Sequence, residues 1–439
     1  MSDPTAHEVA EHLQHPERAR ARLGSRALAP FRSPGYRRLA VALVFSTFAN
    51  GVWLVGLVWE VIRTGGGPTQ LSVVTTASAV GVLLPALLAG VVADRVPQRT
   101  ILIGVSTLEA VGMGAAAALS LIGATEVWQL AVIAFLLGMG MAFYWPAYTA
   151  LVPALVPESD LQAINGFEGM VRPTIGQALG PGVAGLVVGA ASPGSALLVA
   201  SVSSVAGLAA LLVVPRTPLR REITDQPGAH PVRTALADVR EGLVYMRHTP
   251  WLLATLLFAS LMLLVVMGPL EVLVPFLVKD RLGGGPADHA LVLMAFGVGG
   301  AVGSIVMGAV PMPRRYLTVM NVMFGAASLP MITMGLATAV WQVVVSALVS
   351  GALFSASLVI WGTLLQRRVP AHLLGRVSSL DFFVSLSLMP VSMALAAPVS
   401  NLVGLTETFV IAGVLPIGVA VVATFWARLP EDEIAHPLD

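Results

Sequence analysis

The sequence predicts an all-α membrane protein with twelve transmembrane helices, arranged as two pseudo-symmetric halves of six helices each. Hydrophobic residues make up 56% of the 439 residues and charged residues only 11%, whereas soluble domains carry about 25% charged residues. The mean hydropathy is +0.83. Apolar runs of about 20 to 25 residues match a hydrocarbon core of ~30 Å. They lack the alternating pattern of a transmembrane barrel, which excludes that fold.

The apolar runs place twelve spans along the chain. In order, we expect them at 39–62, 70–93, 100–123, 127–152, 162–190, 193–215, 251–278, 288–310, 317–338, 340–365, 377–402 and 404–427.

The basic residues predict the topology. With both termini on one side, only Arg63, Lys279 and Arg281 fall in loops on the other side, and Arg172 falls inside a span. The positive-inside rule therefore predicts cytoplasmic termini. The arginine-rich start has no apolar stretch or cleavage site of a signal peptide, so we expect it to be retained.

A long proline-containing loop divides the spans into six and six. Val156-Pro157 after the fourth span returns as Val369-Pro370 after the tenth, 213 residues later. This echo favours two parallel repeats, as in transporters whose halves move around a site near the membrane midplane. The predicted domains are a cytoplasmic tail (1–38), an N-terminal bundle (39–215), a cytoplasmic linker (216–250), a C-terminal bundle (251–427) and a cytoplasmic C-terminal tail (428–439).

The loop after the second span carries Gly90, Asp94, Arg95 and Arg99 in the spacing G-x-x-x-D-R-x-x-x-R. This pattern resembles the signature of the major facilitator superfamily, with Pro97 in place of the usual glycine. The resemblance implies a charge cluster that latches the two halves at the cytoplasmic side, with the acid facing a helix N-terminus. We expect Asp381, near Arg376, to belong to the same latch. The competing interpretation is that these are topology-setting flanking charges.

The fifth span contains Gly176, Gly180, Pro181 and Gly185, with Ala184 in place of one glycine. This resembles the superfamily's antiporter motif G-x-x-x-G-P-x-x-G-G, which is associated with exporters. Small residues four apart allow helices to approach closely, and proline bends a helix. A generic packing seam is the alternative.

Charged residues inside spans cost roughly 2.5 to 3.5 kcal/mol each on insertion scales and need a partner or a wet cavity. Glu168 and Arg172 are candidates for proton or substrate coupling; because they are spaced i, i+4 and can pair, a structural salt bridge is the alternative for both. Glu109 has no local partner; it is either a proton-coupling carboxyl group or a neutral packing residue. Asn50, midway along the first span, is a substrate contact or a link between helices. Glu60 and Glu271 lie near outer span ends, where a solvated position is expected, with an outer gate as the alternative for Glu271.

Five aromatic or methionine side chains are candidates for an adaptable apolar pocket, with core or lipid-facing packing as the alternative for each. They are Trp53, Tyr144, Trp145, Met267 and Trp361.

Several chemistries have no signature in the sequence. The chain has no cysteine, no phosphate-binding G-x-x-x-x-G-K-[ST] motif and no H-E-x-x-H motif. The histidines do not form a metal-ligand pattern. We therefore expect no enzyme activity, no metal, no cofactor and no nucleic-acid partner, with a proton gradient as the energy source.

Across its whole length the chain resembles the exporter branch of the major facilitator superfamily that includes enterobactin, macrolide and multidrug exporters. The loop motifs that carry this include Leu155-Val156-Pro157 and Gln366-Arg367-Arg368-Val369-Pro370. The resemblance implies a monomeric efflux transporter of the bacterial plasma membrane that exports amphipathic small molecules by proton antiport and alternating access. Two alternatives stay open: a dedicated siderophore or metabolite exporter, and a non-transporting lipid-handling or sensory protein on the same scaffold.

Overall fold

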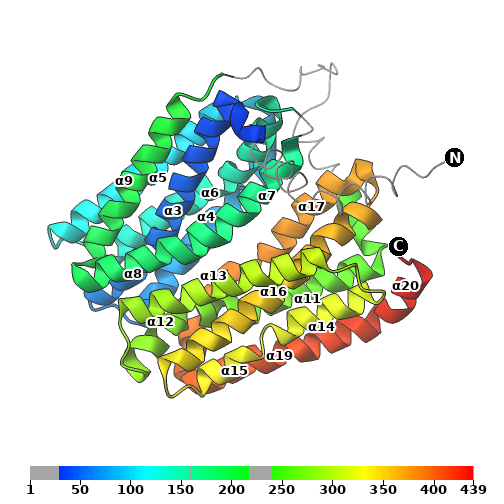
Figure 1. Cartoon of the computed structure of the whole chain (residues 1–439). Helices are drawn as coiled ribbons and strands as arrows, with labels where there is room; N and C mark the ends of the chain where they lie inside the picture. Colours follow the sequence, from blue (N-terminus) through cyan, green and yellow to red (C-terminus); the bar gives the residue numbers. More distant parts are fainter. Residues whose placement is uncertain (1–28, 158–159, 217–239, 439) are drawn as a thin grey trace, which may run out of the picture.

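The computed structural model describes residues 29–157, 160–216 and 240–438, and every regular element in these ranges is helical (Figure 1). Prolines begin several of the long helices, where their fixed φ suits the first turn and their missing N–H is no loss. The N-terminal bundle comprises η1 (Ala29–Arg32), α3 (Pro34–Arg63), α4 (Pro68–Arg95), α5 (Gln98–Leu121), α6 (Val127–Leu151), η2 (Val152–Ala154), α7 (Leu161–Val171), η4 (Arg172–Leu179), α8 (Gly180–Ala190) and α9 (Pro193–Leu212).

The C-terminal bundle contains more interruptions. Its elements are α11 (Pro250–Gly268), η5 (Pro269–Leu273), α12 (Val274–Phe276), η6 (Leu277–Arg281), α13 (Pro286–Ala309), α14 (Tyr316–Ala326), α15 (Pro330–Gly335), α16 (Val340–Arg368), α17 (Ala371–Leu386), α18 (Met389–Val403), α19 (Leu405–Trp426) and α20 (Leu429–Ala435).

Eleven helical segments within the described residues are long and apolar enough to cross a membrane. The continuous run of α7, η4 and α8 lies where the sequence predicts the fifth span. The predicted all-α, twelve-span fold is thus confirmed to a close approximation. The predicted ninth and eleventh spans differ from expectation because each is broken, before Pro330 and before Met389-Pro390. Proline cannot complete the hydrogen-bonding ladder of the preceding turn.

Corresponding helix pairs in the two halves pack alike. A Cβ atom added to Gly138 of α6 would lie 2.2 Å from the carbonyl oxygen of Ser78 in α4. At Gly351 of α16, 213 residues later, it would lie 2.1 Å from the carbonyl oxygen of Phe296 in α13. Each glycine therefore lets two backbones touch at a position where any side chain would separate them.

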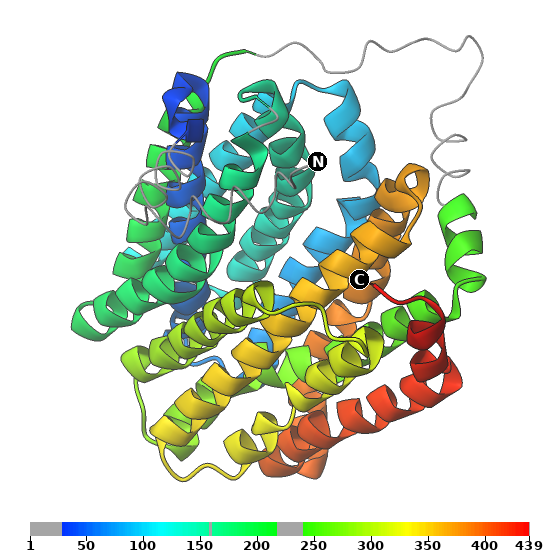
Figure 2. The same ribbon diagram turned by 45° about the vertical axis from the view of Figure 1, so that its right-hand side comes forward.

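The hydrophobic cores show where the halves meet. We call the end of the bundles at which α3 and α11 begin and α9 ends the linker end, and the opposite end the far end (Figures 1 and 2). One shared core joins both bundles and includes Leu71 and Leu197 from one half and Leu277 and Phe409 from the other. Two further cores, around Tyr148 and around Trp251, each belong to one bundle and lie toward the linker end.

Helix α20 is docked on the C-terminal bundle at the linker end, within the stretch predicted to be a tail. Glu433 is buried and accepts hydrogen bonds from the backbone N–H of Leu317 (2.9 Å) and from the N–H and hydroxyl of Thr318 (3.1 and 2.8 Å). It thereby caps the first turn of α14, where free N–H groups favour a carboxylate. Asp432 pairs with Arg368 of α16, whose guanidinium stacks on Trp251.

We expect Glu433→Ala to destabilise the protein by roughly 1 to 3 kcal/mol, because one buried and two partly buried donors lose their acceptor. Thermal unfolding of the purified protein in detergent measures this as a lower Tm. Glu431→Ala is the control, since Glu431 is exposed and makes only a long ion pair with Arg428 (3.8 Å). Equal melting temperatures for the two variants would contradict the capping role.

Candidate functional site

A buried carboxyl group, Glu109, lies at the middle of α5. It is 4% exposed and accepts hydrogen bonds from the Ser46 hydroxyl and from the Asn50 amide, both at 3.1 Å. The amide also donates to the Ser46 carbonyl oxygen at 3.0 Å. Ser46 and Asn50 lie one turn apart on α3, so both face α5. The structure therefore brings the predicted residues Asn50 and Glu109 together, and among the described residues Glu109 forms no ion pair.

A second carboxyl group, Glu168, lies on α7 with Arg172 one turn later. Their charged groups are 3.9 Å apart, a long pair in the spacing the sequence predicts. The Arg172 guanidinium carbon sits 3.7 Å from the centroid of the Trp145 ring, and the side chain stays 48% exposed. Stacking on an aromatic face stabilises a guanidinium without neutralising it. Arg172 is thus held by two weak contacts and keeps one side free.

Three aromatic rings of α6 pack together near the two carboxyl groups. Tyr144 stacks on Tyr148 with ring centroids 5.9 Å apart, and Trp145 meets both rings edge-on. Tyr144 is buried, its hydroxyl group lies near Ser46, and the charges of Glu109, Glu168 and Arg172 act on it. Tyr144 and Trp145, predicted as pocket residues, thus belong to an aromatic cluster beside the acidic residues.

The glycines of the fifth span form two close contacts on opposite faces. A Cβ atom on Gly51 of α3 would lie 2.4 Å from the Gly176 carbonyl oxygen and close to Gly180 and Pro181. A Cβ atom on Gly185 would lie 2.4 Å from the Ala290 Cβ of α13, in the other half. The antiporter-like motif therefore fits α8 both against its own bundle and across the interface at the far end.

The structure describes only part of the predicted latch. The structure does not describe the surroundings of Gly90 or the side chains of Asp94, Arg95 and Arg376. Arg99 donates to the Leu212 carbonyl oxygen in its own half (2.7 Å). Asp381 accepts from the Trp361 indole (3.0 Å) and the Ser385 hydroxyl (3.2 Å), both in the C-terminal half. Trp361 is thus a buried partner of Asp381, and its ring also packs on Trp251.

The remaining predicted residues are spread through the molecule. Trp53 is buried in the shared core, and Met267 lines a cavity in the C-terminal bundle. Glu271 lies in η5, ten residues before the end of its helical run, deeper than the outer position expected. Glu60 differs from the solvated expectation: it is fully buried and bonded to Arg63 and Ser120.

The sequence analysis missed Ser46 as a partner of Glu109. Ser46 carries a detectable signal, because it stands four residues before Asn50 and so shares its helix face.

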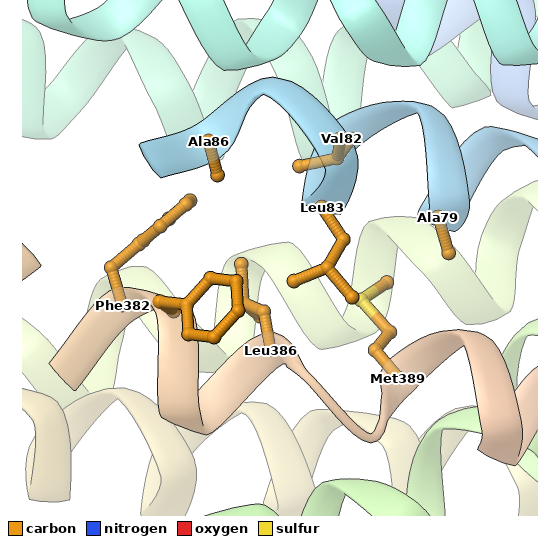
Figure 3. Close-up of a pocket in the computed structure, with 8 residues that line it drawn as sticks. Ala79, Val82, Leu83, Ala86, Phe382, Leu386 and Met389 are labelled. Atoms are coloured by element: carbon orange, nitrogen blue, oxygen red, sulfur yellow. The ribbon is translucent and has the colours of Figure 1, made fainter. Parts of the chain in front are cut away.

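An apolar seam joins the halves between α4 and the break separating α17 from α18. Ala79, Val82 and Leu83 face Phe382, Leu386 and Met389 across it (Figure 3). Among the described residues these side chains make no hydrogen bond across the seam, so they interact across it only by van der Waals contact. Such a surface can separate without leaving unpaired polar groups.

This architecture and site define a polytopic membrane transporter with two six-helix halves, and not an enzyme. The chain matches the model of the family described as "transmembrane secretion effector" over residues 25–437, and it belongs to this family of the major facilitator superfamily. The family resemblance drawn from the sequence is confirmed.

Relatives and solved structures agree with this assignment. The multidrug efflux pump Tap of Mycolicibacterium fortuitum is 28% identical over 402 residues, covering 88% of this chain and 94% of that protein. Macrolide efflux protein A of Streptococcus pyogenes is 24% identical over 337 residues, covering 76% and 81%. The crystal structure of the nucleoside transporter NupG shares the fold, with a TM-score of 0.66 at 14% identity over 90% of this chain and 98% of that one.

We expect Gly185→Ala to open the far-end contact between the halves, because the new methyl group meets the Ala290 Cβ. Gly189→Ala, on the same helix but with open space around it, is the matched control. The chain has no cysteine, so spin labels at Leu186→Cys and Leu291→Cys, both exposed positions, report the distance. A longer distance is expected for Gly185→Ala alone; unchanged distances in both variants would refute the contact.

Proposed function

We propose that the protein exports amphipathic small molecules from the cytoplasm by proton antiport and alternating access. The observation that carries this proposal is Glu109, a carboxyl group at mid-depth of the N-terminal bundle whose described partners are all neutral. The relatives described above, multidrug and macrolide efflux proteins, support drugs or natural products as the substrate class.

The orientation we propose places the linker end in the cytoplasm of a bacterium and the bundles in its plasma membrane. The supporting observation is the distribution of basic residues, of which only Arg63, Lys279 and Arg281 belong to the far-end loops. The binding site forms between halves of one chain, so the proposed unit is a monomer.

The packing of the halves supports alternating access. They share a core toward the far end and have separate cores toward the linker end. We interpret this arrangement as the state that is closed outward and able to receive substrate from the cytoplasm. In the opposite state the contacts at the far end must separate. The surfaces that would move are the apolar seam and the contact of Gly185 with Ala290 between the halves.

Proton coupling would work through the charge of Glu109. An isolated carboxylate in a nonpolar interior is costly, so a proton, or a cationic group of the substrate, is a natural partner for it. Competition between the two for one carboxyl group would exchange a proton for a substrate. Ser46 and Tyr144 would connect Glu109 to Glu168, and the half-exposed Arg172 marks where this chain of polar groups reaches solvent.

We expect Glu109→Gln to reduce substrate-stimulated proton flux into proteoliposomes by roughly a hundredfold, because glutamine keeps the size, can still accept from Asn50 and can donate to the Ser46 hydroxyl, but does not titrate. Substrate exchange without a pH gradient should persist. Glu407→Gln, an exposed carboxylate on α19, is the control. The test uses ethidium, erythromycin and a siderophore as substrates.

Undiminished flux in Glu109→Gln would remove this residue from the coupling mechanism. Flux with the siderophore alone would favour a dedicated exporter, and no flux with any compound would favour the non-transporting alternative.

We expect Tyr144→Phe to slow proton flux several-fold while leaving the half-saturating substrate concentration unchanged. The substitution removes only the hydroxyl group, and the ring contacts to Trp145 and Tyr148 stay. Tyr245→Phe, in the segment before α11 that packs against the C-terminal core, controls for the general loss of a tyrosine hydroxyl. A shift of half-saturation at normal maximal flux would instead assign Tyr144 to substrate contact.

A further inference from the structure

A methionine-rich cavity lies inside the C-terminal bundle, apart from the carboxyl groups of the N-terminal bundle. Its volume is about 50 Å³, well above the roughly 10 to 15 Å³ that one water requires. Four methionines and three phenylalanines account for seven of its twelve lining residues. Methionine side chains are flexible and polarizable, so such walls adapt to apolar groups of different shape.

The cavity lies at mid-depth. Phe354, one of its walls, is the middle residue of α16. Met331 and Met334 belong to the shared core, whereas Met262 and Phe324 belong to the core of the C-terminal bundle. The cavity therefore lies at the boundary between the region where the halves share a core and the region where their cores are separate. Transporters of this architecture hold their substrate at this depth.

One unpaired polar group faces this apolar space. Ser350 is 7% exposed and its hydroxyl has no hydrogen-bond partner among the described residues. The other lining serine, Ser328, already donates to the carbonyl oxygens of Gly325 and Gly413. Buried hydroxyl groups are nearly always paired with a hydrogen-bond partner. A ligand with a polar atom at its edge would therefore gain a hydrogen bond to the Ser350 hydroxyl group.

Irregular helices form two walls of the cavity. Ala327 and Ser328 lie at the break between α14 and α15. Leu270 lies in η5, a wide-turned segment that also contacts α4 of the other half. Wide helical turns are frequent at functional sites. A movement of the halves at η5 would therefore alter the cavity directly.

We infer that this cavity binds the tip of the apolar part of an amphipathic substrate, a branched aliphatic group or an aromatic ring admitted by movement of the methionine side chains, with Ser350 bonding to a polar atom at its edge. The inference rests on the proposed export function and specifies which half of the protein holds which part of the substrate. The apolar part lies among the methionines, and the cationic or polar part lies toward the N-terminal bundle.

Equilibrium binding of radiolabelled tetraphenylphosphonium to the purified full-length protein tests the inference without requiring transport. Ser350→Leu should raise the Kd at least tenfold by filling the cavity, and Ala327→Leu, which fills it from the helix break, should do the same. Ser350→Ala keeps the space and should retain binding. Val349→Leu, the exposed neighbour of Ser350, is the matched control and should bind as the wild type does. Melting temperatures establish that each variant is folded.

Wild-type affinity in both filling variants would overturn the inference, as would absence of binding to the wild-type protein. Native mass spectrometry that finds a phospholipid in the wild type, absent from the filling variants and displaced by no probe, would assign the cavity to lipid and overturn it too. Binding that depends on the cavity without any proton flux would uphold the cavity site and count against the antiport mechanism alone.

Discussion

Inside a bilayer, a charged or hydrogen-bonding side chain must find its partner within the protein, and this constraint organises the polar residues of the structure. Glu60 meets Arg63 and Ser120 at the far end, and Asp381 meets Trp361 and Ser385. Glu433 caps a helix at the linker end. Each of these carboxyl groups ties two elements together and is satisfied by them. Glu109 has no charged partner among the described residues, and the Ser46 hydroxyl group can donate to its carboxylate form or accept from its protonated form. A group with that freedom suits exchange better than scaffolding.

The same scaffold needs surfaces that hold together without being fixed. Gly138 and Gly351 bring backbones into contact within each bundle, where any side chain would intrude. Gly185 does so between the bundles. The apolar seam of α4 against α17 and α18 adds contact without hydrogen bonds. Strong pairing is thus concentrated within halves and weak, shape-dependent contact between them, which allows two rigid bodies to change their relative position at low cost.

The helices and the residues at which they begin and end could be predicted from the sequence, because hydropathy and proline determine the conformation of the chain around them. Most long helices begin or end within a few residues of the expected bounds, and the Glu168–Arg172 pair follows from spacing on one helix. The breaks before Pro330 and Met389 escaped prediction because an apolar run reads the same whether or not its helix is continuous. The pairing of Glu109 with Ser46 and of Asp381 with Trp361 could not be inferred, since the members of each pair lie on different helices; Ser46 and Glu109 are 63 positions apart and meet only through packing of α3 on α5. Met267 was singled out as a pocket residue, but the cavity around it depends on helices from four separate spans.

The two halves pack alike at corresponding helix pairs yet differ in chemistry. The N-terminal bundle holds Glu109, Glu168, Arg172 and the tyrosines of α6, whereas the C-terminal bundle holds a cavity of methionine and phenylalanine at the same depth. An amphipathic molecule has the same division between a polar and an apolar part. If each half recognises one part, the molecule itself bridges the halves, and its binding energy depends on their relative position. A ligand can shift a conformational equilibrium only by the difference in its affinity for the two states. A substrate that spans both bundles meets that condition, because separating or tilting them must weaken at least one of its two contacts.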